Sequence, residues 1–280
     1  MKSRWIFRIY NLLVIVALPF ILVGVMIRWR KRFARGLERW SERWGHLSSE
    51  QVGRFRDGNY WWVHAVSLGE VKSIEIFLRE IPRQLGVRVL LSVVTPEALS
   101  WAVEKNVAAE IIAAPMDLPW VVRRVVRAVR PRVFISVESE FWPNLLRETK
   151  RAGARVALVN GRISAHSYRS YKYIRALLSV LWDGFDLLAV RQHEDASRFI
   201  DLGVPPRLIH VTGNLKYDLP LPSRAPGGPA PDPAMLTLVV GSSREGEEKE
   251  LLPVMEKLRR LHPTLRVIWE IGRASCRERV

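Results

Sequence analysis

The chain has 280 residues, and its 48% hydrophobic and 26% charged content is typical of a globular protein, which excludes an intrinsically disordered chain. Lysine and arginine number 44 against 28 acidic residues, so the net charge of +16 predicts a polyanionic partner: nucleic acid, an anionic bilayer or a phosphorylated substrate. The one cysteine, Cys276, excludes an internal disulfide, and the histidines lack metal-ligand spacing, so no metal site is expected.

The chain begins with an apolar segment between two basic flanks. Residues 9–27 carry no charge. The length of this run is at the lower limit for a transmembrane helix and exceeds that of the apolar region of a removable signal peptide. Basic residues dominate positions 28–43, and by the positive-inside rule they hold the bulk of the chain in the cytoplasm. We predict an N-terminal membrane anchor helix, and Pro19 leaves open whether it spans the bilayer or lies in one leaflet.

Beyond residue 58, short apolar runs alternate with helical patterns. Strands are predicted at 60–66, 87–94, 110–114, 133–137, 156–159, 187–190 and 208–211. Helices are predicted at 70–84, 96–104, 119–129, 143–151 and 194–202. This alternation predicts an α/β fold of βαβ units around a parallel sheet, with ligands beyond the carboxyl ends of the strands.

Residues 219–234 are rich in proline and glycine and predict a linker. After it, a strand at 236–240, a helix at 246–261 and a strand at 265–269 predict the first βαβ unit of a second domain, too little to bury its own apolar faces. We expect five segments: an anchor with its basic flank (1–45), a first Rossmann-like domain (46–218), the linker (219–234), the start of a second Rossmann-like domain (235–270), and a tail (271–280).

Two strand ends carry carboxylates. Glu70 follows the first strand of the predicted sheet and opens a helix, where it is most simply a first-turn residue beside free backbone amides. Glu138 ends the strand at 133–137 and fits either an ion pair with an arginine or a catalytic role. Carboxylates from two such loops can face one site, an arrangement suited to general-base and electrostatic work on a sugar hydroxyl.

Two further loops fit anion binding. In the first, Gly213 and Asn214 suit a tight turn, and Lys216 can hold a phosphate, although an exposed, solvated lysine fits equally. The second, residues 241–248, places small residues and free amides at a helix start, which suits an anion, while its acidic residues suit a plain helix N-terminus.

Residues 150–182 carry seven basic side chains and no acidic one, interleaved with tyrosines. Such a stretch can lie against phospholipid or a phosphorylated glycolipid, or hold an RNA backbone. The predicted anchor favours lipid.

Taken together, and in this order, these loops resemble the Kdo (3-deoxy-D-manno-octulosonic acid) transferases of lipopolysaccharide assembly. The resemblance runs from the anchor to about Glu270 and rests on the stretches ERWG, WVHAVSLGE, ESEFWPN, LVNGRIS, TGNLKYD and GSSREGEE. It implies a GT-B glycosyltransferase, with two Rossmann-like domains, of which the first binds the acceptor and the second the donor, and the active site between them. It also implies inverting, metal-independent transfer of Kdo from CMP-Kdo to a lipid A precursor (lipid IVA) at the cytoplasmic face of the bacterial inner membrane, without a cofactor and without nucleic acid.

The resemblance also assigns roles to single residues. Glu70 matches the general base, and Glu138 and Lys216 match stabilisers of the transition state. Arg244 stands where the family usually has histidine. Residues expected to contact substrates are Ser67, Gly69, Asn214, Ser242, Ser243, Arg244 and Glu245.

Residues 271–280, IGRASCRERV, do not resemble the family and read like a translated sequencing adapter, so we do not expect Cys276 to be native. We expect the coding sequence to continue past Glu270 into the nucleotide-binding half, and the chain as given to be inactive in transfer. Two other function classes stay open: another membrane-bound GT-B transferase with a different nucleotide sugar, and a non-enzymatic basic module that binds anionic lipid or RNA.

Overall fold

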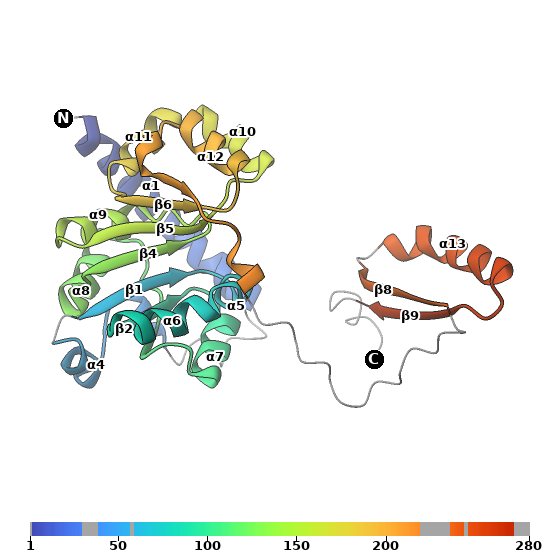
Figure 1. Ribbon diagram of the computed structural model, residues 1–280. Helices are drawn as coiled ribbons and strands as arrows, with labels where there is room; N and C mark the ends of the chain where they lie inside the picture. The colour runs from blue at the N-terminus through green and yellow to red at the C-terminus, as the bar shows by residue number, and fades with distance from the viewer. Residues whose placement is uncertain (1, 30–38, 57–58, 219–235, 244–245, 272–280) are drawn as a thin grey trace. The chain divides into compact units, whose positions relative to one another are not determined.

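The computed structural model describes residues 2–29, 39–56, 59–218, 236–243 and 246–271. Its contacts divide the chain into two compact units, Met1–Pro220 and Leu221–Val280, each taken here by itself (Figure 1). The predicted linker at 219–234, the basic residues at 30–38 and the tail from residue 272 lie outside the described residues.

A parallel sheet forms the centre of the first unit. Within its described residues, seven strands pair in the order β3-β2-β1-β4-β5-β6-β7, and every pairing is parallel. The α/β prediction is therefore confirmed, and the strand order reverses between β1 and β4. The strands are β1 (Tyr60–Ala65), β2 (Arg88–Val93), β3 (Glu110–Ala113), β4 (Val133–Val137), β5 (Arg155–Gly161), β6 (Leu187–Val190) and β7 (Ile209–Val211).

Helices connect these strands and cover both faces of the sheet (Figure 1). Trp62 and Phe134 point into one buried cluster with α8, α9, α11 and α12, while the next residues, Val63 and Ile135, point into the other with α5, α6 and α7. The helices are α1 (Lys2–Trp29), α3 (Trp40–Arg43), α4 (Ser49–Arg54), α5 (Leu68–Ser73), α6 (Glu75–Leu85), α7 (Pro96–Lys105), α8 (Pro119–Val129), α9 (Pro143–Arg151), α10 (Ala165–Tyr173), α11 (Arg175–Trp182) and α12 (His193–Asp201).

Local sequence explains where several helices begin and end. Pro96, Pro119 and Pro143 each occupy the first turn of a helix, where a missing N–H costs nothing. At the other end, Gly86 and Asn106 adopt the left-handed conformation that terminates a helix. These stops agree with the predicted boundaries to within two residues.

One prediction for the helices was wrong, and two helices were not predicted. The single helix predicted at 70–84 is two, α5 and α6, with a break at Ile74. The Ser73 hydroxyl donates a 2.7 Å hydrogen bond to the Glu70 carbonyl and thereby competes with the backbone ladder. The stretch after β5, considered only as a basic surface, forms α10 and α11, and Trp182 of α11 is fully buried.

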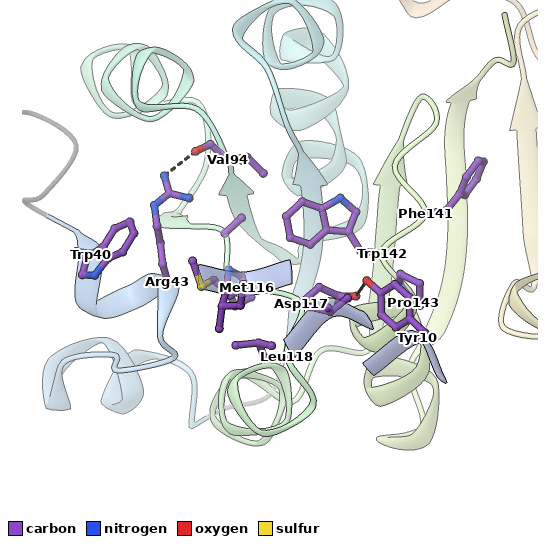
Figure 2. Close-up of a pocket in the computed structure, with 14 residues that line it drawn as sticks. Tyr10, Trp40, Arg43, Val94, Met116, Asp117, Leu118, Phe141, Trp142 and Pro143 are labelled. Carbon is purple, nitrogen blue, oxygen red and sulfur yellow. Dashed lines mark hydrogen bonds between the residues drawn. The ribbon is translucent and has the colours of Figure 1, made fainter. Parts of the chain in front are cut away.

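The N-terminal helix α1 packs on the first unit. Phe7 is 7% exposed within the core, and the Arg147 guanidinium lies 4.3 Å from the centre of its ring. Tyr10 donates a 2.8 Å hydrogen bond to Asp117 (Figure 2). Asn144 donates one of 2.7 Å to Asn11. Among the described residues, no helix has the length and apolarity needed to cross a membrane.

The second unit contains one βαβ element in its described residues. Its parts are β8 (Thr237–Ser243), α13 (Glu247–Leu261) and β9 (Arg266–Ile271), and the two strands pair in parallel. Val239 and Ile268 remain 62% and 43% exposed. This agrees with the expectation that one such element cannot bury its own apolar faces.

Gly161 provides a test of the packing at the end of β5. A Cβ atom there would lie 2.9 Å from Leu158 and 3.2 Å from Val190, both fully buried. We predict that Gly161→Ala lowers the free energy of unfolding by about 1–3 kcal/mol through overpacking. The control is Gly53→Ala in α4, where nothing lies within 4 Å and the change should be neutral or slightly stabilising. Equal urea midpoints for the two variants would contradict this packing.

The Asp117 carboxylate should make stability depend on pH. It accepts hydrogen bonds from Tyr10 and from the backbone N–H groups of Asn144 and Leu145, at the start of α9. Burial nevertheless raises its pKa from 3.8 to about 6. Between these values the folded chain holds a proton that the unfolded chain releases, so this group's contribution to stability falls as the pH rises through that window. Asp117→Asn should flatten this part of the stability–pH curve, and an unchanged slope would refute the shift.

Candidate active site

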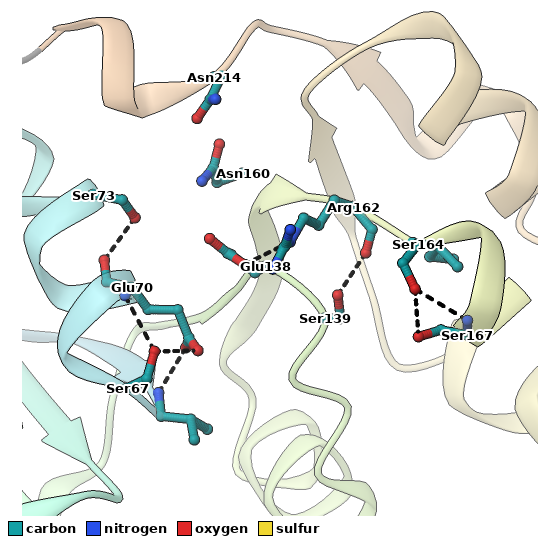
Figure 3. A network of polar contacts seen from close by, with 12 residues as sticks. Ser67, Glu70, Ser73, Glu138, Ser139, Asn160, Arg162, Ser164, Ser167 and Asn214 are labelled. Atoms are coloured by element: carbon teal, nitrogen blue, oxygen red, sulfur yellow. Dashed lines mark hydrogen bonds and ion pairs between the residues drawn. The ribbon is translucent and has the colours of Figure 1, made fainter. Parts of the chain in front are cut away.

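The candidate site lies at the carboxyl edge of the sheet, where the strand order reverses. Because β1 and β4 are neighbours, the loop after β1 and the loop after β4 meet there. Figure 3 shows Glu70, Glu138, Asn160 and Asn214, from four different segments of the chain, in one region of this edge. The sequence-predicted carboxylates are thus brought to the same part of the molecule.

Glu70 is held firmly in the first turn of α5. Ser67 caps this helix by accepting a hydrogen bond from the Glu70 N–H, and the Glu70 carboxylate accepts bonds from Val66 N (2.7 Å) and Ser67 Oγ (2.9 Å). The simpler interpretation, a first-turn helix residue, is therefore correct as structure. It does not exclude chemistry, because a carboxylate with two such bonds keeps further lone pairs for a ligand.

The electrostatic environment of Glu70 favours its protonated form. Burial is the largest cause of a raised pKa, and the neighbouring charges of Glu140 and Glu138 raise it further, against the two hydrogen bonds that lower it. A carboxylate with a raised pKa is a stronger proton acceptor than an ordinary one, as a general base requires.

Glu138 adopts a strained backbone conformation directly after β4. Its φ is +58°, in the left-handed region that a non-glycine residue rarely occupies, and its side chain is 7% exposed. Arg162 donates a 2.7 Å hydrogen bond from Nε to the carboxylate, so the arginine pairing considered in the sequence analysis is present. Backbone strain of this kind concentrates at functional sites.

Glu140 is a third carboxylate of this group, and sequence reasoning did not select it as a site residue. It accepts a 3.0 Å hydrogen bond from the Trp142 indole N–H. Burial raises its pKa, and the charge of Glu138 adds to the effect. Only the folded arrangement shows that Glu140 and Glu138 both influence Glu70.

Asn160, in the LVNGRIS stretch, was also missed. It has a φ of +53° and is 1% exposed. Its Oδ1 accepts a 3.3 Å hydrogen bond from Leu215 N, and because that donor is a backbone N–H, the amide orientation is fixed. Within the described part of the chain, Nδ2 has no hydrogen-bond partner. Asn160 therefore ties β5 to the loop that carries Lys216.

Some of the other predicted site residues lie beside Glu70, and others do not contact it. Ser67 borders Glu70, and Gly69 is exposed in the same turn. The Asn214 side chain accepts a 3.2 Å hydrogen bond from the backbone N–H of Lys216. Lys216 lies in the 3₁₀ turn η2 (Leu215–Asp218), and its side chain is exposed. Among the described contacts, that side chain makes no hydrogen bond to Glu70 or Glu138.

Two of the predicted residues of the second unit, Ser242 and Ser243, lie at the end of β8. Ser243 is 4% exposed, and its hydroxyl accepts a 2.9 Å hydrogen bond from the Trp269 indole N–H. Ser242 belongs to the same strand. Arg244 and Glu245 lie outside the described residues.

The basic stretch at 150–182 is less available to anions than its sequence suggests. Most of its cations face acidic residues that precede or follow it in the chain. The pairs are Lys150 and Arg155 with Asp186, Arg151 with Glu148, Arg162 with Glu138, and Lys172 with Asp201. In the portion of the chain that is described, no cluster of three or more potential metal-binding side chains occurs.

Residues 38–219 match the family described as 3-deoxy-D-manno-octulosonic-acid transferase (kdotransferase). A similar protein of that name occurs in Haemophilus influenzae, with 28% identity over 75% of this chain and 49% of that one. Another occurs in Bordetella pertussis, with 32% identity over 67% of this chain and 45% of that one. A probable mitochondrial 3-deoxy-D-manno-octulosonic acid transferase of Arabidopsis thaliana is 30% identical over 76% of this chain and 47% of its own. The chain spans about half the length of these relatives.

Two solved structures resemble this one in fold alone. The S. aureus MnaA–UDP structure has a TM-score of 0.52 and 10% sequence identity, over 77% of this chain and 63% of that one. The UDP-GlcNAc 2-epimerase of Neisseria meningitidis bound to UDP-GlcNAc has a TM-score of 0.52 and 10% sequence identity, over 76% of this chain and 66% of that one.

The mutual influence of the three carboxylates can be tested directly. We predict that Glu140→Gln lowers the pKa of Glu70, since removal of a like charge eases ionisation, and that Glu138→Gln lowers it less, since Glu140 is the larger of the two effects. Carboxyl-carbon NMR titration measures both, with the exposed Glu104→Gln as the control. A Glu70 pKa that is the same in Glu140→Gln as in the unmodified chain would show that the two groups are not neighbours.

Proposed function

The chain belongs to the 3-deoxy-D-manno-octulosonic-acid transferase family, and from that membership we propose that it is the acceptor-binding part of a membrane-associated glycosyltransferase. In this proposal Kdo moves from CMP-Kdo to a hydroxyl of the lipid A precursor lipid IVA during lipopolysaccharide assembly. The chain spans about half the length of its relatives, and in this proposal a donor-binding half completes a GT-B arrangement.

The observation that carries the proposal is the position of Glu70. It is fixed by two hydrogen bonds at the edge of the sheet where α/β proteins bind ligands, and its pKa is raised by burial. A rigid carboxylate of this kind suits the removal of a proton from an acceptor hydroxyl. The carboxylates of Glu138 and Glu140 beside it add negative charge that complements a developing positive charge on a sugar.

The reaction then follows in one displacement. The acceptor hydroxyl oxygen attacks the anomeric carbon of Kdo and forms the new C–O bond, while Glu70 takes the hydroxyl proton. The bond between the anomeric carbon and the phosphate oxygen of CMP breaks, and CMP leaves with the electron pair. Attack from the face opposite CMP inverts the anomeric centre. We propose that the transfer needs neither a metal nor a cofactor, as the family resemblance implies.

The remaining predicted residues take supporting roles in this proposal. Lys216, on the exposed turn tied to Asn160, stabilises the charge that develops on the leaving phosphate. Ser67, Gly69 and Asn214 border the acceptor. Ser242, Ser243, Arg244 and Glu245 contribute contacts to the donor.

We further propose that the chain works at the cytoplasmic face of the bacterial inner membrane, attached through α1. The outward side of this helix exposes large apolar residues: Leu13 is 63% and Phe20 is 76% exposed. Such an apolar face, together with a net charge of +16, supports attachment to an anionic leaflet. We expect no nucleic-acid partner.

The test is the rate of Kdo transfer to lipid IVA by the enzyme that includes its donor-binding half. Glu70→Gln should lower kcat by about 10²–10⁴-fold, because the hydroxyl proton loses its acceptor, while the KM for lipid IVA changes little. Glu104→Gln, a change to a 70% exposed side chain on α7, is the control and should keep full activity. Full activity in Glu70→Gln would refute the assignment of the base.

A further inference from the structure

A mainly apolar cavity lies between α1 and the carboxyl edge of the sheet, and Glu70, Glu138 and Glu140 do not line it (Figure 2). Its volume is about 410 Å³, which is within the range of small-molecule sites. One stripe of α1 forms its roof, with Tyr10, Val14 and Leu18 spaced four residues apart on the same side of the helix. Helix α3, through Trp40 and Arg43, and the loops after β2, β3 and β4 form the rest of the wall. The loop residues include Val94, Ala114, Met116, Leu118, Phe141 and Trp142.

Three polar side chains of this cavity, Tyr10, Asp117 and Arg43, make hydrogen bonds within the protein. Asp117 accepts three hydrogen bonds, one of them from Tyr10. Arg43 donates a 2.5 Å hydrogen bond to the Val94 carbonyl. A sugar or a nucleotide would therefore find few groups to bind, whereas a hydrocarbon chain would gain from the apolar wall.

The same helix separates this cavity from an exposed apolar surface. Between the roof residues, the side chains of Leu12, Leu13 and Val16 are 62%, 63% and 59% exposed. A second apolar cavity of about 250 Å³ shares Tyr10, Phe141 and Pro143 with the first. Hydrocarbon that covers the outer face of α1 thus lies one helix away from two cavities beneath it.

Trp142 connects the cavity to the proposed site of reaction. Its ring belongs to the cavity wall, and its indole N–H donates to Glu140, whose charge acts on Glu70. We propose that the cavity beneath α1 binds an acyl chain of the lipid acceptor while the acceptor hydroxyl lies at Glu70. This inference rests on the proposed function for the identity of the lipid, but the cavity can be tested without any transfer reaction.

The test uses the 280-residue chain and single-chain alkyl probes that carry a terminal diazirine, below their micelle concentration. Affinity should rise about fourfold for each added methylene and then level off when the cavity is full, for probes of roughly eight to sixteen carbons. Photo-cross-links mapped by mass spectrometry should fall on the wall residues Val14, Leu18 and Met116.

Two neighbouring substitutions on α1 make a matched pair. Val14→Trp fills the cavity and should weaken probe binding at least tenfold, whereas Leu13→Trp changes only the exposed face and should leave it within twofold. Ala114→Leu fills the cavity from the opposite wall and should also weaken binding, which covers the case in which Val14→Trp displaces α1. Circular dichroism confirms folding of each variant.

Several results would overturn the proposal. The first is equal binding of the alkyl probes by Val14→Trp and Leu13→Trp, and the second is cross-links confined to the outer face of α1. The third is probe binding that appears only after residues 30–38 are replaced by a Gly-Ser linker. The fourth is a dimer of the chain that Val14→Trp abolishes. The last two would assign the cavity to a segment of this chain or to a second copy. None of them would affect the Glu70-dependent transfer assay, so failure of the cavity and failure of the proposed function remain distinguishable.

Discussion

The reversal of strand order between β1 and β4 is the constraint on which the rest of the site depends. Parallel strands deliver their carboxyl ends to one edge, and at the reversal the following helices diverge to opposite faces, which leaves the loops between them open to a ligand. Glu70 follows β1 and Glu138 follows β4, so residues far apart in the chain meet there. The buried strands fix this edge, since Trp62, Val63, Phe134 and Ile135 fill the two layers around it.

Bringing carboxylates together at this edge is unfavourable in itself, and the surrounding contacts limit the cost. Arg162 forms an ion pair with Glu138, while backbone and hydroxyl donors stabilise Glu70. The remaining repulsion and burial raise the pKa of Glu70 and of Glu140. This residual destabilisation, with the strained backbone at Glu138 and Asn160, is what a site prepared for a ligand would retain.

The sheet and most of its helices were predictable from the sequence, because proline starts, left-handed stops and apolar strands are local features. The bounds of α8, α9 and β4 agree with those predicted. Contacts between distant segments were not predictable: the Tyr10–Asp117 bond joins residues 107 positions apart, and the pairing of the basic stretch with Asp186 and Asp201 depends on the folded chain. Likewise, loop geometry alone revealed Glu140 and Asn160. The roles assigned to Glu70, Glu138 and Lys216 remain predictions from family resemblance.

The most direct measurement is hydrogen exchange of this chain with and without lipid IVA. If the chain is the acceptor-binding part of a sugar transferase, lipid IVA should slow exchange in the loops at 66–70 and 138–144, at the reversal of strand order, in addition to α1. Slower exchange confined to the outer side of α1 and to the basic stretch at 150–182 would contradict the account, because it would describe a module that binds an anionic lipid surface and has no acceptor site at the sheet edge.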